Sequence, residues 1–462
     1  MTQDTDTDAE TDAAAGSVTA TTTAPAPALE TDALLDDPGI RIVVCCGSGG
    51  VGKTTTAAAL GVRAAERGRK VVVLTIDPAR RLAQSMGIDS LDNIPRRVSG
   101  IDGESAGELH AMMLDMKRTF DEIVEAHADG ERARAILENP FYQSLSAGFA
   151  GTQEYMAMEK LGQLRARNEW DLIIVDTPPS RSALDFLDAP KRLGSFLDGK
   201  FIKVLMAPAK MGGRAGMKFL NVGMSMMTGT LGKLLGGQFL RDVQTFVAAM
   251  DTMFGGFRTR ADATYKLLQA PGTAFLVVAT PEPDALREAA YFVERLAAEE
   301  MPLAGLVLNR VHGSDAARLS AERALAAAEN LDGVGIVDQT AGKAGLRDPA
   351  DWSVPSETLV DPDASEHDNF EDLEPDPEAA TESRTATKAA SVEQLTAGLL
   401  RLHAERMQVV AREQRTRDRF TALHPEVAVT QVAALPGDVH DLAGLRAIGD
   451  RLATGSAPAG AA

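Results

Sequence analysis

The sequence predicts an α/β fold in which a mostly parallel β-sheet is flanked by helices. Short apolar runs rich in Val, Ile and Leu recur along the chain, as expected of strands that are buried on both faces. Segments with helical patterning separate these runs, and this alternation is typical of a parallel sheet. The composition agrees, because 44% hydrophobic residues in 462 positions can form a large core.

The individual elements follow from this pattern. Strands are predicted at 42–46, 70–76, 170–175, 274–279, 303–308 and 427–432. Helices are predicted at 55–67, 284–299, 391–419 and 442–452. Residues 104–168 and 181–268 also have helical patterning, but the second stretch is punctuated by glycine. We therefore predict one domain over 39–458, with these two stretches forming an inserted glycine- and methionine-rich helical subdomain.

The net charge of −19 is concentrated in two segments. Residues 1–40 contain nine acidic side chains and residues 361–383 contain ten, and neither segment has a Lys or Arg. Their composition predicts a disordered tail over 1–38 and a disordered linker over about 350–388. The rest of the chain is close to neutral, which argues against a nucleic-acid-binding surface. No apolar run is long enough for an integral membrane segment, and no signal peptide is evident, so we expect a cytoplasmic protein.

The segment after the first predicted strand has the spacing of a phosphate-binding loop, G-x-x-x-x-G-K-[ST], and a helix follows it. Backbone N–H groups of such a loop surround phosphate oxygens, while Lys53 supplies a positive charge and Thr54 a hydroxyl for Mg²⁺. The predicted fold is therefore that of a P-loop NTPase. Its predicted nucleotide-binding residues are Gly47, Ser48, Gly49, Gly50, Val51, Gly52, Lys53, Thr54 and Thr55.

Two aspartates follow predicted strands and are candidate partners of this loop. Asp176 ends the run W-D-L-I-I-V-D and has the position of a Walker B carboxylate, which holds Mg²⁺ through its water shell. Asp77 ends K-V-V-V-L-T-I-D and is a second candidate for water-mediated Mg²⁺ binding or for orienting the attacking water. Strand-end aspartates are also common as helix caps. Lys53, Asp77 and Asp176 are the predicted catalytic residues.

Several motifs together resemble the ArsA family of P-loop ATPases, which includes arsenical-pump ATPases and targeting factors for tail-anchored membrane proteins. The motifs are G-S-G-G-V-G-K-T-T-T-A, L-T-I-D-P-A-R-R-L, G-T-Q-E-Y-M-A-M-E-K-L, D-T-P-P-S-R-S-A-L-D-F-L, G-L-V-L-N-R-V and A-L-P-G-D-V-H-D-L-A-G-L. The resemblance implies Mg²⁺-dependent ATP hydrolysis by a dimer. It also implies that Asp77 prepares the attacking water, that residues 176–181 sense the γ-phosphate, that Asn309 binds the adenine ring, and that Pro436 lies in an adenine-packing loop.

The sequence departs from the family pattern in two ways. The phosphate loop of the family typically carries a signature lysine that reaches the partner's nucleotide, but Ser48 occupies that position here. The only cysteines are the neighbours Cys45 and Cys46 in a predicted core strand, where they cannot jointly hold one ion. Arsenite binding by several thiolates and a zinc-clamped dimer are therefore not expected.

The helical insertion contains eight of the 17 methionines, between Met206 and Met253, together with many glycines. Methionine surfaces adapt to varied apolar partners. In tail-anchor targeting members the corresponding region forms a hydrophobic groove for a transmembrane helix, so the resemblance implies a groove for a hydrophobic client protein. A loosely packed helical core is the alternative.

We predict an ATPase whose hydrolysis cycle drives a conformational switch that binds or hands on a hydrophobic protein, or regulates a partner. The partner is either a second copy or a paralogous ATPase. The alternative is a catalytically weak, ATP-binding regulatory subunit paired with a lysine-containing paralogue, because Ser48 carries no charge. A partitioning ATPase of the related Min/Par type fits less well, because such proteins usually carry the signature lysine.

Overall fold

A computed structural model describes residues 26–76, 81–88, 91–101, 107–140, 142–143, 152–178, 256, 259–337 and 377–455. The chain divides into two compact units. The first contains the described residues up to Asn309 together with 416–431 and 437–455, and the second contains those of 310–415 together with 432–436.

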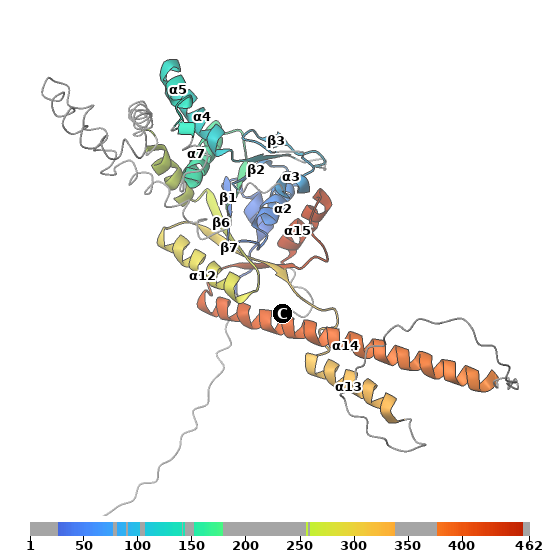
Figure 1. Cartoon of the computed structure of the whole chain (residues 1–462). Coiled ribbons are helices and arrows are strands. Elements are labelled where there is room, and N and C mark those ends of the chain that lie inside the picture. The colour runs from blue at the N-terminus through green and yellow to red at the C-terminus, as the bar shows by residue number, and fades with distance from the viewer. Residues whose placement is uncertain are drawn as a thin grey trace, which may run out of the picture. The chain divides into compact units, whose positions relative to one another are not determined.

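An eight-stranded sheet forms the core (Figure 1). Its strands are β1 (Ile42–Cys46), β2 (Lys70–Thr75), β3 (Arg96–Arg97), β4 (Glu108–Met113), β5 (Leu172–Asp176), β6 (Thr273–Ala279), β7 (Leu303–Val311) and β8 (Val429–Ala433). They follow the order β3-β4-β2-β5-β1-β6-β7-β8. The pairings β4–β2, β2–β5, β5–β1, β1–β6 and β6–β7 are parallel, and β3 runs antiparallel to β4. This confirms the predicted mostly parallel α/β sheet.

The register of the central strands brings the ends of β1, β2 and β5 together. Cys45 of β1 lies opposite Asp176 of β5 and opposite Leu276 of β6. Thr75 of β2 also lies opposite Asp176. All residues of β1, β5 and β6 are buried, which explains their continuous apolar runs. The loop after β1 therefore starts between β5 and β6, at the carboxyl edge where ligands bind in open α/β sheets.

Helices of the first unit flank this sheet (Figure 1). They include α1 (Thr31–Asp36), α2 (Lys53–Glu66), α3 (Arg81–Ser85), α4 (Met116–His127), α5 (Gly130–Leu137), α7 (Thr152–Arg167), α12 (Pro283–Ala298) and α15 (Leu442–Thr454). The alanine-rich helix α2 packs against β1, β2 and β5, and α12 packs against β6. Gly61 allows the close approach of α2, since a Cβ atom there would lie 2.6 Å from a methyl group of Val73.

The two helices α1 and α15 hold α2 from its outer side. Arg63 of α2 forms ion pairs with Asp32 of α1 and Asp450 of α15, at 2.5 and 2.8 Å. The carbonyl oxygen of Leu452 in α15 accepts hydrogen bonds from the hydroxyls of Thr31 and Thr430. Segments from both ends of the described chain thus fix the helix that follows the phosphate-binding loop.

The second unit contains α13 (Ala321–Val337) and most of α14 (Pro377–Leu423). Side chains of α14 hold the loop after β7: Glu413 contacts the Nδ1 atom of His312 at 2.6 Å, and Arg406 donates to the carbonyl oxygen of Gly313. Within α14, Ala397 and Ala404 are buried. Apolar side chains at 392, 395, 399 and 402 are exposed.

The structure corrects three predicted boundaries. The predicted helical stretch 104–168 contains the strand β4, whose residues E-L-H-A-M-M lack the β-branched side chains that mark strands. The predicted disordered tail contains α1, where Asp32 pairs with Arg63. The predicted disordered linker overlaps α14, which begins at Pro377.

Much of the predicted helical subdomain lies outside the described residues. This applies to 181–255 and therefore to the glycine- and methionine-rich stretch, whereas 259–269 are described and helical. No helix among the described residues is both long and apolar enough to cross a lipid bilayer.

Candidate active site

The predicted phosphate-binding loop lies between β1 and α2, and its backbone requires glycine at specific positions. Gly47, Gly50 and Gly52 have φ angles of 148°, 78° and 94°. Side chains at such angles are strained. Space is also limiting, because a Cβ atom on Gly47 would lie 2.1 Å from the carbonyl oxygen of Val278, and one on Gly52 would lie 2.2 Å from Nδ2 of Asn309. The loop conformation therefore depends on glycine in two independent ways.

Lys53 is the first residue of α2 and is buried, with 5% of its surface exposed. Its ammonium group donates a hydrogen bond to the carbonyl oxygen of Ser48, at 2.7 Å, so the side chain folds back over the loop. The N–H groups at the start of a helix and the positive end of its dipole both favour anions. The site is therefore suited to binding phosphate, because it combines the buried ammonium group of Lys53 with the start of α2 and a glycine-rich loop.

Asp176 at the end of β5 joins the loop to the neighbouring strand. Its Oδ2 atom accepts hydrogen bonds from the hydroxyl of Thr54 at 2.6 Å and from that of Thr75 at 2.9 Å. The Asp176 side chain is fully buried. Hydroxyl and carboxylate oxygens are ligands that Mg²⁺ prefers, so the Thr54–Asp176 pair has the chemistry that the cation requires.

Asn309 lies in β7 and reaches the same loop. Its side-chain amide donates a hydrogen bond to the carbonyl oxygen of Val51, at 2.8 Å. In this structure Asn309 therefore supports the phosphate-binding loop directly, a contact that sequence reasoning did not anticipate.

Two further predicted site residues lie elsewhere. Thr55 is half-buried in the first turn of α2. Pro436 follows β8 and belongs to the second unit.

Both cysteines are buried in β1, and neither forms a disulfide. Burial raises the pKa of Cys46 to about 12, and burial together with the nearby Asp176 carboxylate raises the pKa of Cys45 well above its usual range. Because the thiolate is the reactive and metal-binding form, these residues are structural. Among the described residues, no group of His, Cys, Asp and Glu side chains has a metal-binding arrangement.

The structure also places residues that sequence reasoning missed. Thr75 contacts Asp176, as described above, and Gln153 of α7 donates a hydrogen bond to the carbonyl oxygen of Ile76 at 3.0 Å. Thr75 and Ile76 directly precede Asp77 in the motif L-T-I-D-P, and Gln153 lies in the motif G-T-Q-E-Y-M-A-M-E-K-L, so Thr75 and Gln153 were both close to sequence signals. Asp77 itself and residues 179–181 of the second predicted switch lie outside the described residues.

Comparison with known proteins identifies the family. The sequence model of the ArsA ATPases, described as anion-transporting ATPase, matches residues 40–325. An ATPase GET3 from Podospora anserina is 27% identical over 301 residues, covering 63% of this chain and 80% of that protein. A second ATPase GET3, from Malassezia globosa, is 30% identical over 160 residues, covering 35% of this chain and 45% of the relative.

A protein named ATPase ASNA1 homolog 2, from Paramecium tetraurelia, is 25% identical over 282 residues and covers 60% of this chain and 78% of its own length. The family match includes the loop, both strands that carry Thr75 and Asp176, and Asn309. The chain therefore belongs to the ArsA family of ATPases.

Proposed function

We propose that this chain hydrolyses ATP with Mg²⁺ at the loop 47–54 and that hydrolysis drives a switch in a dimer. The observation that carries the proposal is the 2.6 Å contact between the Thr54 hydroxyl and the buried Asp176 carboxylate, directly beside the loop. A hydroxyl oxygen at the start of α2 and a carboxylate oxygen at the end of β5 are suited to a nucleotide phosphate with its cation.

Each residue has a distinct task in the proposed reaction. The N–H groups of the loop and Lys53 bind the β- and γ-phosphates and stabilise the charge that develops during transfer. Thr54 and Asp176 would hold Mg²⁺, Asp176 through the water shell of the ion, and the ion would supply charge neutralisation when bound. Asp77 orients a water molecule and accepts a proton from it as the water oxygen forms a bond to the γ-phosphorus. The bond from that phosphorus to the bridging oxygen breaks, ADP leaves with that oxygen, and the proton passes from Asp77 to the departing phosphate or to solvent.

Substitution of Asp77 tests this assignment. Asp77→Asn is expected to bind ATP as tightly as the wild-type chain and to lose hydrolysis, because an amide is a poor acceptor for the proton of the attacking water. Both quantities can be measured on one preparation, with a fluorescent ATP analogue and a phosphate-release assay. Normal turnover by the variant would remove Asp77 from the mechanism.

We propose further that the switch serves a hydrophobic client protein. The resemblance to tail-anchor targeting ATPases supports this, as do the methionines and glycines between Met206 and Met253. A labelled peptide of about 20 apolar residues should bind the ATP-bound and ADP-bound chains with different affinities. A matched peptide with two central lysines is the control. Equal affinity in both nucleotide states would contradict a client switch.

A second candidate function rests on Ser48. Its carbonyl oxygen accepts from Lys53, but its hydroxymethyl side chain carries no charge that could cross to a partner's nucleotide. This favours a weakly active regulatory subunit that pairs with a lysine-containing paralogue. The Ser48→Lys variant distinguishes these two hypotheses. If its ATP turnover differs little from that of the wild-type chain, the chain is a self-sufficient ATPase. If turnover appears only with the lysine, the chain is a regulatory subunit.

A further inference from the structure

We propose that Gln153 is a positioning residue for ATP hydrolysis, and that its side-chain amide holds the peptide group that joins Ile76 to Asp77. This inference rests on the proposed role of Asp77. Gln153 lies in the first turn of α7, far from the phosphate-binding loop in sequence. It lies in the quoted motif G-T-Q-E-Y-M-A-M-E-K-L but was not among the predicted site residues.

Both backbone polar groups of Ile76 have fixed partners. Its N–H donates to the carbonyl oxygen of Asp176 at 3.0 Å, and its carbonyl oxygen accepts from Nε2 of Gln153, also at 3.0 Å. Ile76 is itself buried, with 2% of its surface exposed. Because the Ile76 carbonyl and the Asp77 nitrogen share one planar peptide group, rotation of that plane would break the Gln153 hydrogen bond.

These contacts form a continuous path from α7 to the phosphate-binding loop. Gln153 contacts Ile76, Ile76 contacts the backbone of Asp176, and the Asp176 carboxylate contacts Thr54. Ile76, which directly follows β2, is thus tied to β5 by its N–H group and to α7 by its carbonyl oxygen. An attacking water must be placed within a fraction of an ångström, so such support affects rate strongly.

Partly buried ion pairs anchor α7 itself, and this makes Gln153 suitable for positioning. The Glu159 side chain is 3% exposed and contacts Nε of Arg260 at 2.7 Å. The hydroxyl of Tyr155 donates to the same carboxylate at 3.0 Å, and burial followed by the nearby carboxylate raises the pKa of Tyr155, so the phenol remains a donor.

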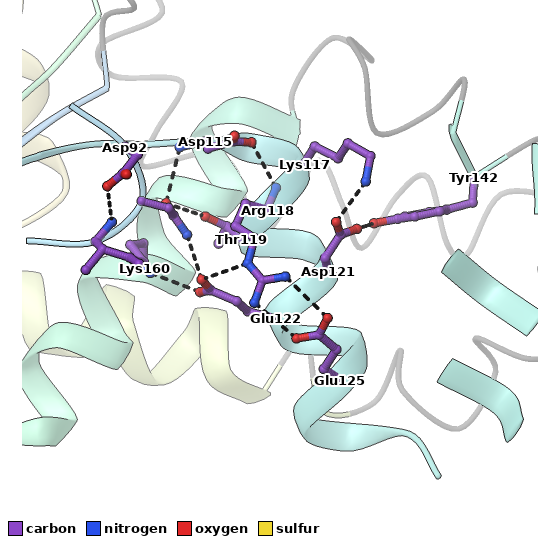
Figure 2. Close-up of polar contacts among 12 residues, drawn as sticks. Asp92, Asp115, Lys117, Arg118, Thr119, Asp121, Glu122, Glu125, Tyr142 and Lys160 are labelled. Carbon is purple, nitrogen blue, oxygen red and sulfur yellow. Dashed lines mark hydrogen bonds and ion pairs between the residues drawn. The ribbon is translucent and has the colours of Figure 1, made fainter. Parts of the chain in front are cut away.

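The next residue of α7, Lys160, makes a second anchor. Its ammonium group, in a side chain only 4% exposed, contacts Glu122 of α4 at 3.0 Å. Asn93 also donates to Glu122 and accepts from the hydroxyl of Thr119. Figure 2 shows Glu122 between Lys160 and Arg118. The ion pairs of Glu159 and Lys160 restrict the movement of α7, so the Gln153 amide is held at a defined position.

The test compares two variants of Gln153 in the full-length chain. Gln153→Met keeps the length of the side chain but removes the donor. We expect its kcat to fall about 10- to 100-fold, the usual effect of losing a supporting hydrogen bond, with ATP affinity unchanged. Gln163→Met is the matched control, because Gln163 is a half-buried residue of the same helix with no side-chain hydrogen bond to a described residue.

Gln153→Glu provides a readout that a purely structural role would not give. Ionised glutamate cannot donate to the Ile76 carbonyl oxygen, whereas protonated glutamate can. The ratio of variant to wild-type kcat should therefore rise as the pH is lowered and the introduced carboxyl group beside the carbonyl gains its proton. The same variant serves if Gln153→Met does not fold.

The outcomes separate this inference from the proposed function. A wild-type chain without turnover would contradict hydrolysis itself. A chain that loses turnover on Asp77→Asn but keeps it on Gln153→Met would overturn only the positioning role. A pH-independent ratio for Gln153→Glu, or a rate loss that arises from weakened ATP binding, would likewise overturn it.

Discussion

Asp176 is the residue that joins the parts of the candidate active site, because its carboxylate accepts hydrogen bonds from Thr54 of the loop and from Thr75 of β2. The Thr54 contact unites two predicted site residues. The Thr75 contact is a supporting one that orients the carboxylate, and supporting contacts of this kind strongly affect metal affinity.

Substitution of Thr75 should therefore weaken Mg²⁺ binding. Thr75→Val preserves shape in a buried position and removes the donor to Asp176. The Mg²⁺ concentration for half-maximal ATP turnover is expected to rise about 10-fold or more, and Thr75→Ser should restore it. Thr273→Val is a matched control, since Thr273 is equally buried in β6 but donates to the carbonyl oxygen of Leu267. An unchanged Mg²⁺ dependence of Thr75→Val would show that the contact has no role in cation binding.

At the scale of elements, the position of α2 depends on α1 and α15, which pair with it through Arg63. The hydrogen bond from Arg63 lowers the pKa of Asp32 below its usual value of 3.8. A carboxylate whose pKa is lowered by folding stabilises the fold above its unfolded pKa, and this contribution is lost as the pH falls through the folded value. The α1–α2 contact is therefore expected to weaken in acid.

Asp32→Asn tests this contact. At pH 7 the variant should unfold with a free energy about 1 kcal/mol lower than that of the wild-type chain, a modest value because Asp32 is partly exposed. The difference should close below a pH of about 4. Urea unfolding at several pH values measures it, with Glu125→Gln, which removes an exposed pair with Arg118, as control. A difference that persists unchanged in acid would contradict the assignment.

The sequence predicted the elements with strong local signals. The strand 42–46 was predicted with its observed bounds, and the helix 442–452 to within two residues at its end. The strand β4 was missed because its residues favour helix, and its pairing with β2 overrides that preference. Thr75 and Gln153 were missed because their roles arise from contacts between distant segments, which no local pattern encodes.

At the scale of the whole molecule, the charge is unevenly distributed. Residues 361–376, which lie outside the described residues, contain eight acidic side chains and end directly before α14. A segment of such composition is expected to act as a spacer. Deleting 361–376 should therefore leave ATP turnover unchanged in a phosphate-release assay. Replacing the segment by Gly and Ser of equal length separates length from charge, and loss of turnover in either variant would contradict a spacer role.

We propose that this chain binds and hydrolyses ATP at the loop 47–54. The most direct measurement is steady-state phosphate release by the purified full-length chain with Mg²⁺ and ATP, compared with Lys53→Ala. We predict turnover by the wild-type chain and none by the variant, which should remain folded by circular dichroism, because Lys53 contributes its charge to phosphate binding. Equal turnover by the two proteins would contradict it.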